Sequence, residues 1–162
     1  MSHEPRLTIA LRALLQAQRV ASLGTAGADG APFVSMVPFA IVLSRGSLVI
    51  HVSGLAAHTR NLLDRPGVSI LVMEREVPGE PVHALSRVTL EGAAVALPRD
   101  SAEWQTCRAD YLARFPEAEP MTQLGDFMFV EIRPSGARQV AGFGAARSMD
   151  ADEVRQALQL PA

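Results

Sequence analysis

The residues best suited to chemistry lie in one short stretch, residues 53–67, between two apolar runs at 47–52 and 68–73. Its polar side chains are those of Ser53, His58, Thr59, Arg60 and Asn61. Pro66 and Gly67 end the run of helix formers, so the pattern predicts a short helix that opens beside these side chains. Free N–H groups at a helix start, together with hydroxyls and a guanidinium, suit a phosphate group. The alternative is a plain connector between two strands, in which Ser53 only caps the helix.

A second candidate is the run 33–39, which is apolar around Ser35 and contains Pro38. Proline removes a donor from the strand ladder, so we expect this strand at an edge or facing something other than a partner strand. A flat aromatic ligand lying there would contact backbone groups, and simple edge protection by Pro38 is the alternative. Arg87 begins a long strand and offers its guanidinium to a phosphate, whereas a surface ion pair is its more frequent role.

Several other chemistries are excluded by residue type. All 15 cationic residues are arginine, so there is no lysine for a Schiff base or for a phosphate-binding P-loop. The single cysteine, Cys107, excludes an internal disulfide, and we expect it to pack on an apolar helix face. His3, His51, His58 and His83 show no metal-ligand spacing, and His51 is expected in the core. No metal site and no catalytic acid or base is predicted.

The elements that position these residues follow from periodicity and turn signals. Helices are predicted over 7–17 and 100–115, within 53–67 and from residue 150 onward, and strands over 20–25, 33–42, 47–52, 68–73, 86–96, 127–132 and 137–141. Gly92 is expected to mark a bulge, and residues 134–136 a turn between the last two strands. The fold class is therefore mainly β with flanking helices, an antiparallel split β-barrel of six or seven strands.

Composition sets broader bounds. The 162 residues suit one domain over 1–162, with 48% hydrophobic and 20% charged residues. A net charge of −2 gives no reason to expect nucleic acid as a partner. No apolar run is long enough to cross a bilayer, and residues 1–6 lack the pattern of a signal peptide, so we expect a cytoplasmic protein without a membrane partner.

The order of these segments resembles the FMN-binding split barrels related to pyridoxamine 5′-phosphate oxidase. Segments 32–39, 53–62, 65–72 and 87–92 carry this resemblance, and 125–127 and 142–144 look like the haem-utilisation branch of that superfamily. The resemblance implies a homodimer with FMN at the subunit interface. The flavin contacts that it implies are Ser35, Met36, Val37, Pro38, Ser53, His58, Thr59, Asn61 and Arg87.

Two departures from the family pattern bear on activity. Classical oxidases end with an Arg-x-His pair that is absent here, so oxidation of pyridoxamine phosphate is not expected. Haem-degrading members use a histidine in a C-terminal loop as iron ligand, and no histidine follows His83, although Asp126 matches an acidic position near the haem region. The leading hypothesis is an FMN-binding oxidoreductase with an unidentified small-molecule substrate or electron donor. The alternatives are a haem-binding or haem-degrading protein on the same fold and a non-catalytic flavin-binding module.

Overall fold

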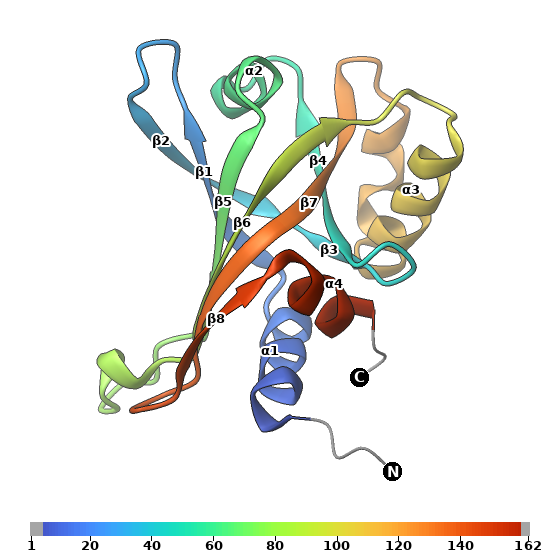
Figure 1. Ribbon diagram of the computed structural model, residues 1–162. Coiled ribbons are helices and arrows are strands. Elements are labelled where there is room, and N and C mark those ends of the chain that lie inside the picture. Colours follow the sequence, from blue (N-terminus) through green and yellow to red (C-terminus); the bar gives the residue numbers. More distant parts are fainter. Residues whose placement is uncertain (1–4, 160–162) are drawn as a thin grey trace.

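The computed structural model describes residues 5–159 and is built on one curled antiparallel sheet (Figure 1). Its helices are α1 (Arg6–Ala17), α2 (Ala57–Asp64), α3 (Ala102–Arg114) and α4 (Ala151–Gln159), with 3₁₀ turns η1 (Val82–Ala84) and η2 (Pro116–Gln123). Its strands are β1 (Val20–Ala26), β2 (Pro32–Pro38), β3 (Ala40–Val42), β4 (Ser47–Ser53), β5 (Gly67–Met73), β6 (Arg87–Ala96), β7 (Phe127–Val140) and β8 (Ala146–Asp150). The sheet order is β2-β1-β5-β6-β7-β4-β3, and β8 pairs with β7. The predicted antiparallel split barrel is confirmed.

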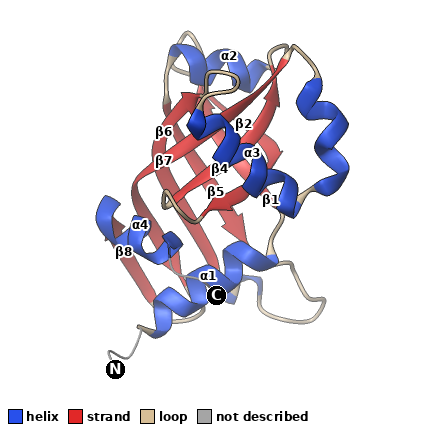
Figure 2. Ribbon diagram, turned by 90° about the vertical axis from the view of Figure 1, so that its right-hand side faces the viewer, coloured by secondary structure: helices blue, strands red, loops and turns tan. Residues whose placement is uncertain are grey.

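Two apolar clusters hold the sheet in its curved shape. The larger cluster fills the inside of the half-barrel, where Leu23, Ile70 and Leu90 meet Leu15 of α1 and Leu158 of α4. The smaller cluster lies under α3 on the β3–β4–β7 side of the sheet. Figure 2 shows α1 and α4 together at one end of the molecule and α2 at the other. Alternating burial along β1, β5 and β6 matches strands with one covered face.

The helix starts follow local capping chemistry. Asp150 and Glu153 exchange reciprocal side-chain to backbone hydrogen bonds of 2.9 and 2.8 Å at the start of α4, as the capping-box pattern predicts. At α3 the cap is Ser101, whose Oγ accepts from the backbone N–H of Trp104. The helix predicted over 100–115 therefore begins later than expected, and Asp100 instead takes a left-handed conformation with φ of 66°.

Two strand predictions were wrong. The strand predicted over 33–42 is divided at Phe39, because β2 pairs with β1 whereas β3 pairs with β4 on the other side of the barrel. The turn predicted over 134–136 lies inside the continuous strand β7, and the hairpin partner of β7 is β8. The bulge expected at Gly92 is confirmed by a register shift opposite Pro134. Proline is tolerated at such an irregularity because no ladder donor is needed there.

The path of the chain places α2 at one end of the sheet. Strand β4 runs up to it, and β5 runs away from it, so Gly67 lies at the α2 end and Met73 at the far end. Among residues 5–159, no helix is both long and apolar enough to cross a membrane.

Candidate functional site

Most of the predicted phosphate ligands come together where α2 begins. The Ser35 hydroxyl on β2 lies 2.9 Å from Nδ1 of His58 on α2, so the edge strand and the helix are joined directly. One turn further along α2, the Asn61 side-chain amide donates to Oγ1 of Thr25 on β1 at 3.1 Å. Partial burial lowers the pKa of His58, so its ring is neutral at pH 7.

The hydroxyl groups of this cluster are already engaged. Thr59 is fully buried and donates to the backbone carbonyl of Ser53 at 2.6 Å. The Ser53 hydroxyl accepts from the N–H of Leu55 and lies 3.4 Å from a carboxylate oxygen of Asp126. The Asp126 carbonyl also accepts from the N–H of Gly54 at 2.6 Å. A carboxylate therefore stands beside the helix start, where a phosphate would meet charge of its own sign.

The remaining predicted contacts are divided between this region and the far end of the sheet. On β2, Met36 is 66% exposed, Val37 is buried and Pro38 is half-buried. Arg87 pairs in register with Met73 and Val140 at the end of the sheet opposite to α2. Its guanidinium donates to the carbonyls of His83 and Leu85. Within one chain, Arg87 therefore does not join the predicted residues that gather around α2, and Pro38 also lies toward the far end of the sheet, in register with Val20.

We expect Thr59→Ala to destabilise the fold by about 1–3 kcal/mol, since it removes a buried hydrogen bond and a buried methyl group. Thr59→Ser keeps the hydroxyl and is the matched control, expected to lose less than half as much. Urea unfolding of the two variants measures the difference. Equal losses would show that the bond to Ser53 contributes nothing.

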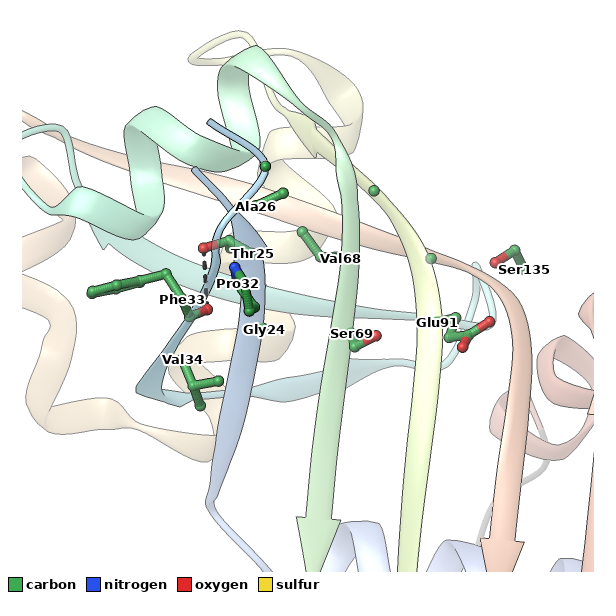
Figure 3. A pocket seen from close by; sticks show the side chains of 13 residues that line it. Gly24, Thr25, Ala26, Pro32, Phe33, Val34, Val68, Ser69, Glu91 and Ser135 are labelled. Carbon is green, nitrogen blue, oxygen red and sulfur yellow. Dashed lines mark hydrogen bonds between the residues drawn. The ribbon is translucent and has the colours of Figure 1, made fainter. Parts of the chain in front are cut away.

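A hollow in the surface of residues 5–159 lies near this cluster but is lined by none of the nine predicted residues. It measures about 470 Å³ and lies on the upper part of β1, β5 and β6, beside the β1–β2 hairpin (Figure 3). Its floor is made of small residues, among them Gly24, Gly67 and Ser69, with Phe33 and Val34 along one side. Glu91 is the one ionisable residue of the lining. Gly24 in the interior of a strand was the available sequence signal, because such a glycine often marks close approach to the backbone.

Comparison with known families decides the evolutionary relationship. The family model described as pyridoxamine 5′-phosphate oxidase matches residues 7–141. The chain belongs to the pyridoxamine 5′-phosphate oxidase family. As a member of this family it is 33% identical over 150 residues to the heme oxygenase HutZ of Vibrio cholerae, covering 92% of this chain and 84% of that protein. It is 38% identical over 119 residues to the non-canonical chloroplastic heme oxygenase HOZ of Arabidopsis thaliana, covering 73% of this chain but only 34% of that protein.

Solved structures agree with this family assignment. A heme-binding protein of Mycobacterium smegmatis superposes with a TM-score of 0.84 at 27% identity, covering 95% of this chain and 62% of that one. A solved structure of HutZ of Vibrio cholerae, which names HutZ a heme storage protein, superposes with a TM-score of 0.74 at 32% identity. The match covers 82% of this chain and 94% of that one. These similarities place this family member in the haem-utilisation branch.

Proposed function

We propose that this protein binds haem. The observation that carries the proposal is the 33% identity to a protein named a heme oxygenase along 92% of the chain. Support also comes from a second relative of that name and from a heme-binding protein with the same fold. The function predicted from the sequence, an FMN-binding oxidoreductase, therefore becomes the second candidate.

The hollow beside the β1–β2 hairpin is chemically suited to a porphyrin. Its volume of about 470 Å³ lies in the ordinary range for ligand sites. Because Gly24, Gly67 and Ser69 are small, a flat ring can approach the backbone of adjacent strands, with Phe33 and Val34 supplying apolar contact. No histidine is among the lining residues described, so an iron ligand has to come from outside this lining.

The proposal includes a homodimer. The edge strand β2 exposes Val34 by 67% and Met36 by 66%, and both lie on the face opposite to the barrel core, in register with Gly24 and Ser22. Exposed apolar side chains on an edge strand favour burial against another chain. A second subunit on this face would border the hollow and is a natural source of further ligand contacts. Sedimentation of the purified protein tests the expected mass of two chains.

FMN remains a candidate because Ser35, His58 and Asn61 gather at the start of α2, where a helix N-terminus favours anions. The fit is weaker than the sequence suggested. The hydroxyl of Thr59 and the amide of Asn61 are engaged within the protein, His58 is neutral, and the Asp126 carboxylate lies beside Ser53. A phosphate that used the Thr59 hydroxyl as a donor would have to break its bond to Ser53, and it would lie near the Asp126 carboxylate.

Two titrations separate the candidates. Haem added to the purified protein is expected to give a saturable Soret band with one haem bound per chain or per dimer. FMN added under the same conditions is expected to show no quenching of flavin fluorescence. Saturable quenching by FMN without a protein-induced Soret shift would reverse the proposal. If the Soret band then disappears when ascorbate is added in air, the protein degrades haem as well as binding it.

We expect Gly24→Leu to weaken haem binding at least about tenfold, that is by about 1.4 kcal/mol or more, because the new side chain would fill the floor of the hollow. A Cβ at Gly24 meets only Ser69 at 3.6 Å, an ordinary van der Waals distance, so the strand accepts a side chain there. Thr89→Leu places the same side chain on the same face of the sheet outside the lining and serves as the control. Equal haem affinity in both variants would remove this hollow from the proposal.

A further inference from the structure

A second polar site lies far from α2, where the β3–β4 turn, β7 and α4 meet. It is a hollow of about 180 Å³ lined by Arg45, Ser47, Glu131, Arg133, Pro134 and Arg155. Three of these six residues are arginines, and they come from three separate elements of the chain. Neither the flavin motifs nor the similarity to haem proteins assigns a role to them.

One buried carboxylate organises two of the arginines. Glu131 on β7 is 1% exposed, and its two oxygens accept from Nε and Nη2 of Arg45 at 2.6 and 3.1 Å, from the Ser47 hydroxyl at 2.7 Å and from Nε of Arg133 at 3.0 Å. Burial alone would raise the pKa of Glu131, but these hydrogen bonds outweigh it and lower the pKa, so the group is ionised at pH 7. With about four acceptor positions on a carboxylate, Glu131 is saturated.

The guanidinium groups keep unused donors. A guanidinium has five N–H groups. Arg45 gives two of its groups to Glu131, and Arg133 gives one. Two positive charges therefore face one negative charge, and the third arginine, Arg155, is paired with Asp152 on its own helix. Glu103 lies near Arg45 but lines a separate hollow with it and makes no hydrogen bond to it among the contacts described.

Local backbone geometry places the backbone of Arg155 against the turn that carries Arg45. Gly46 follows Arg45 in the turn and has φ of 60°, in the left-handed region. A Cβ at this position would lie 2.8 Å from the carbonyl oxygen of Arg155, so the turn can contact α4 closely only because residue 46 is glycine. The backbone of Arg155 and the guanidinium groups that Glu131 binds are thus in place before any ligand arrives, which lowers the entropy cost of binding.

We propose that this hollow binds a phosphate group. Arginine forks match the oxygens of an oxyanion, and a dianion with several acceptor oxygens can bind more than one guanidinium at a time. The volume of about 180 Å³ accommodates a phosphate with a few further atoms. The group can therefore arrive as inorganic phosphate or as a small phosphate monoester, which share this recognition chemistry.

The test uses the full chain and inorganic phosphate as the probe. Arginine Nε–H signals are followed by NMR in protein labelled with ¹⁵N-arginine, with KCl at equal ionic strength as the reference for screening. We expect the signals of Arg45 and Arg133 to shift saturably with a Kd of about 1 mM or below. Glycerol phosphate is titrated in parallel, and tighter binding than phosphate would identify an ester as the preferred form.

Arg133→Gln is expected to weaken phosphate binding at least about tenfold, and Arg155→Gln less strongly because Arg155 shares its charge with Asp152. Arg133 is half exposed, so its replacement should leave the fold intact. Arg138→Gln removes an arginine of the same strand that contacts Ser148 outside the hollow, and is expected to bind like the unmodified chain. Shifts reproduced by KCl alone, or equal affinity in the Arg133 and Arg138 variants, would overturn the proposal.

Discussion

Glu131→Ala is expected to lower the free energy of unfolding by about 3 kcal/mol at pH 7. The reason is that a fully buried carboxylate with four donors is removed, leaving the buried Ser47 hydroxyl and two guanidinium groups without their acceptor. The loss should lie at the low end of the range for broken buried ion pairs, since Arg45 and Arg133 are 33% and 51% exposed and can reach water. Urea unfolding measures the loss.

Two comparisons define this result. Arg138→Ala, an exposed arginine on the same strand, should change the unfolding free energy by less than about 0.5 kcal/mol. Because the pKa of Glu131 is lowered in the fold, its contribution is complete above the ordinary glutamate range and is lost as pH falls through the lower folded value. Glu131→Gln should remove that acid-limb loss, and an unchanged acid limb would contradict the assignment.

Features specified by neighbouring residues could be predicted from the sequence. The start of α4 follows from Asp150 and Glu153, which lie three residues apart, and the bulge on β6 is marked in the sequence by Gly92. At Gly92 a Cβ would lie 2.5 Å from the carbonyl oxygen of Arg133, which explains the choice of residue.

Features specified by distant residues were missed. Pro134 and Gly136 look like a turn locally, but the bulge on β6 lets β7 continue through them, and only the pairing of the two strands reveals this. The break at Phe39 likewise follows from two different pairing partners, β1 before it and β4 after it. Local strand propensity does not indicate which strands pair, so it predicts neither the continuation of β7 nor the break at Phe39.

The candidate site likewise combines features that neighbouring residues specify with features that distant residues specify. Ser53, His58, Thr59 and Asn61 lie close to one another in the structure, as the sequence predicted, because they fall within nine consecutive residues at the end of β4 and in α2. The sequence could not supply their partners, because Thr25 and Asp126 are distant along the chain. The position of Arg87 could have been predicted. Strand β5 runs away from α2, so its antiparallel neighbour β6 has to begin at the far end of the sheet.

Lowering the pH from 7 to 4 is expected to cost about 3 kcal/mol of stability through His51 alone. This side chain is 8% exposed and packs between Phe127, Phe129 and Tyr111, with ring centroids 4.5 to 5.8 Å apart. Burial, assisted by the charge of Arg99, lowers the pKa of His51 from 6.5 to about 4. His51 therefore binds a proton near pH 6.5 in the unfolded chain but only near pH 4 in the folded chain. Stability is full above pH 6.5 and falls between these two values.

A variant is needed to isolate this effect, because other groups titrate in or near the same window. Burial also lowers the pKa of His58, which adds to the loss, whereas burial raises the pKa of Asp110, which favours the fold as pH falls. His51→Phe keeps an aromatic ring in the cluster and removes the titration, so its stability should fall less between pH 6.5 and 4 by about 3 kcal/mol. His83→Gln, at an exposed position, should retain the full slope. Parallel curves for the unmodified chain and the His51 variant would mean that the ring is solvated in the folded state, and the aromatic cluster under α3 would then have to be open to water.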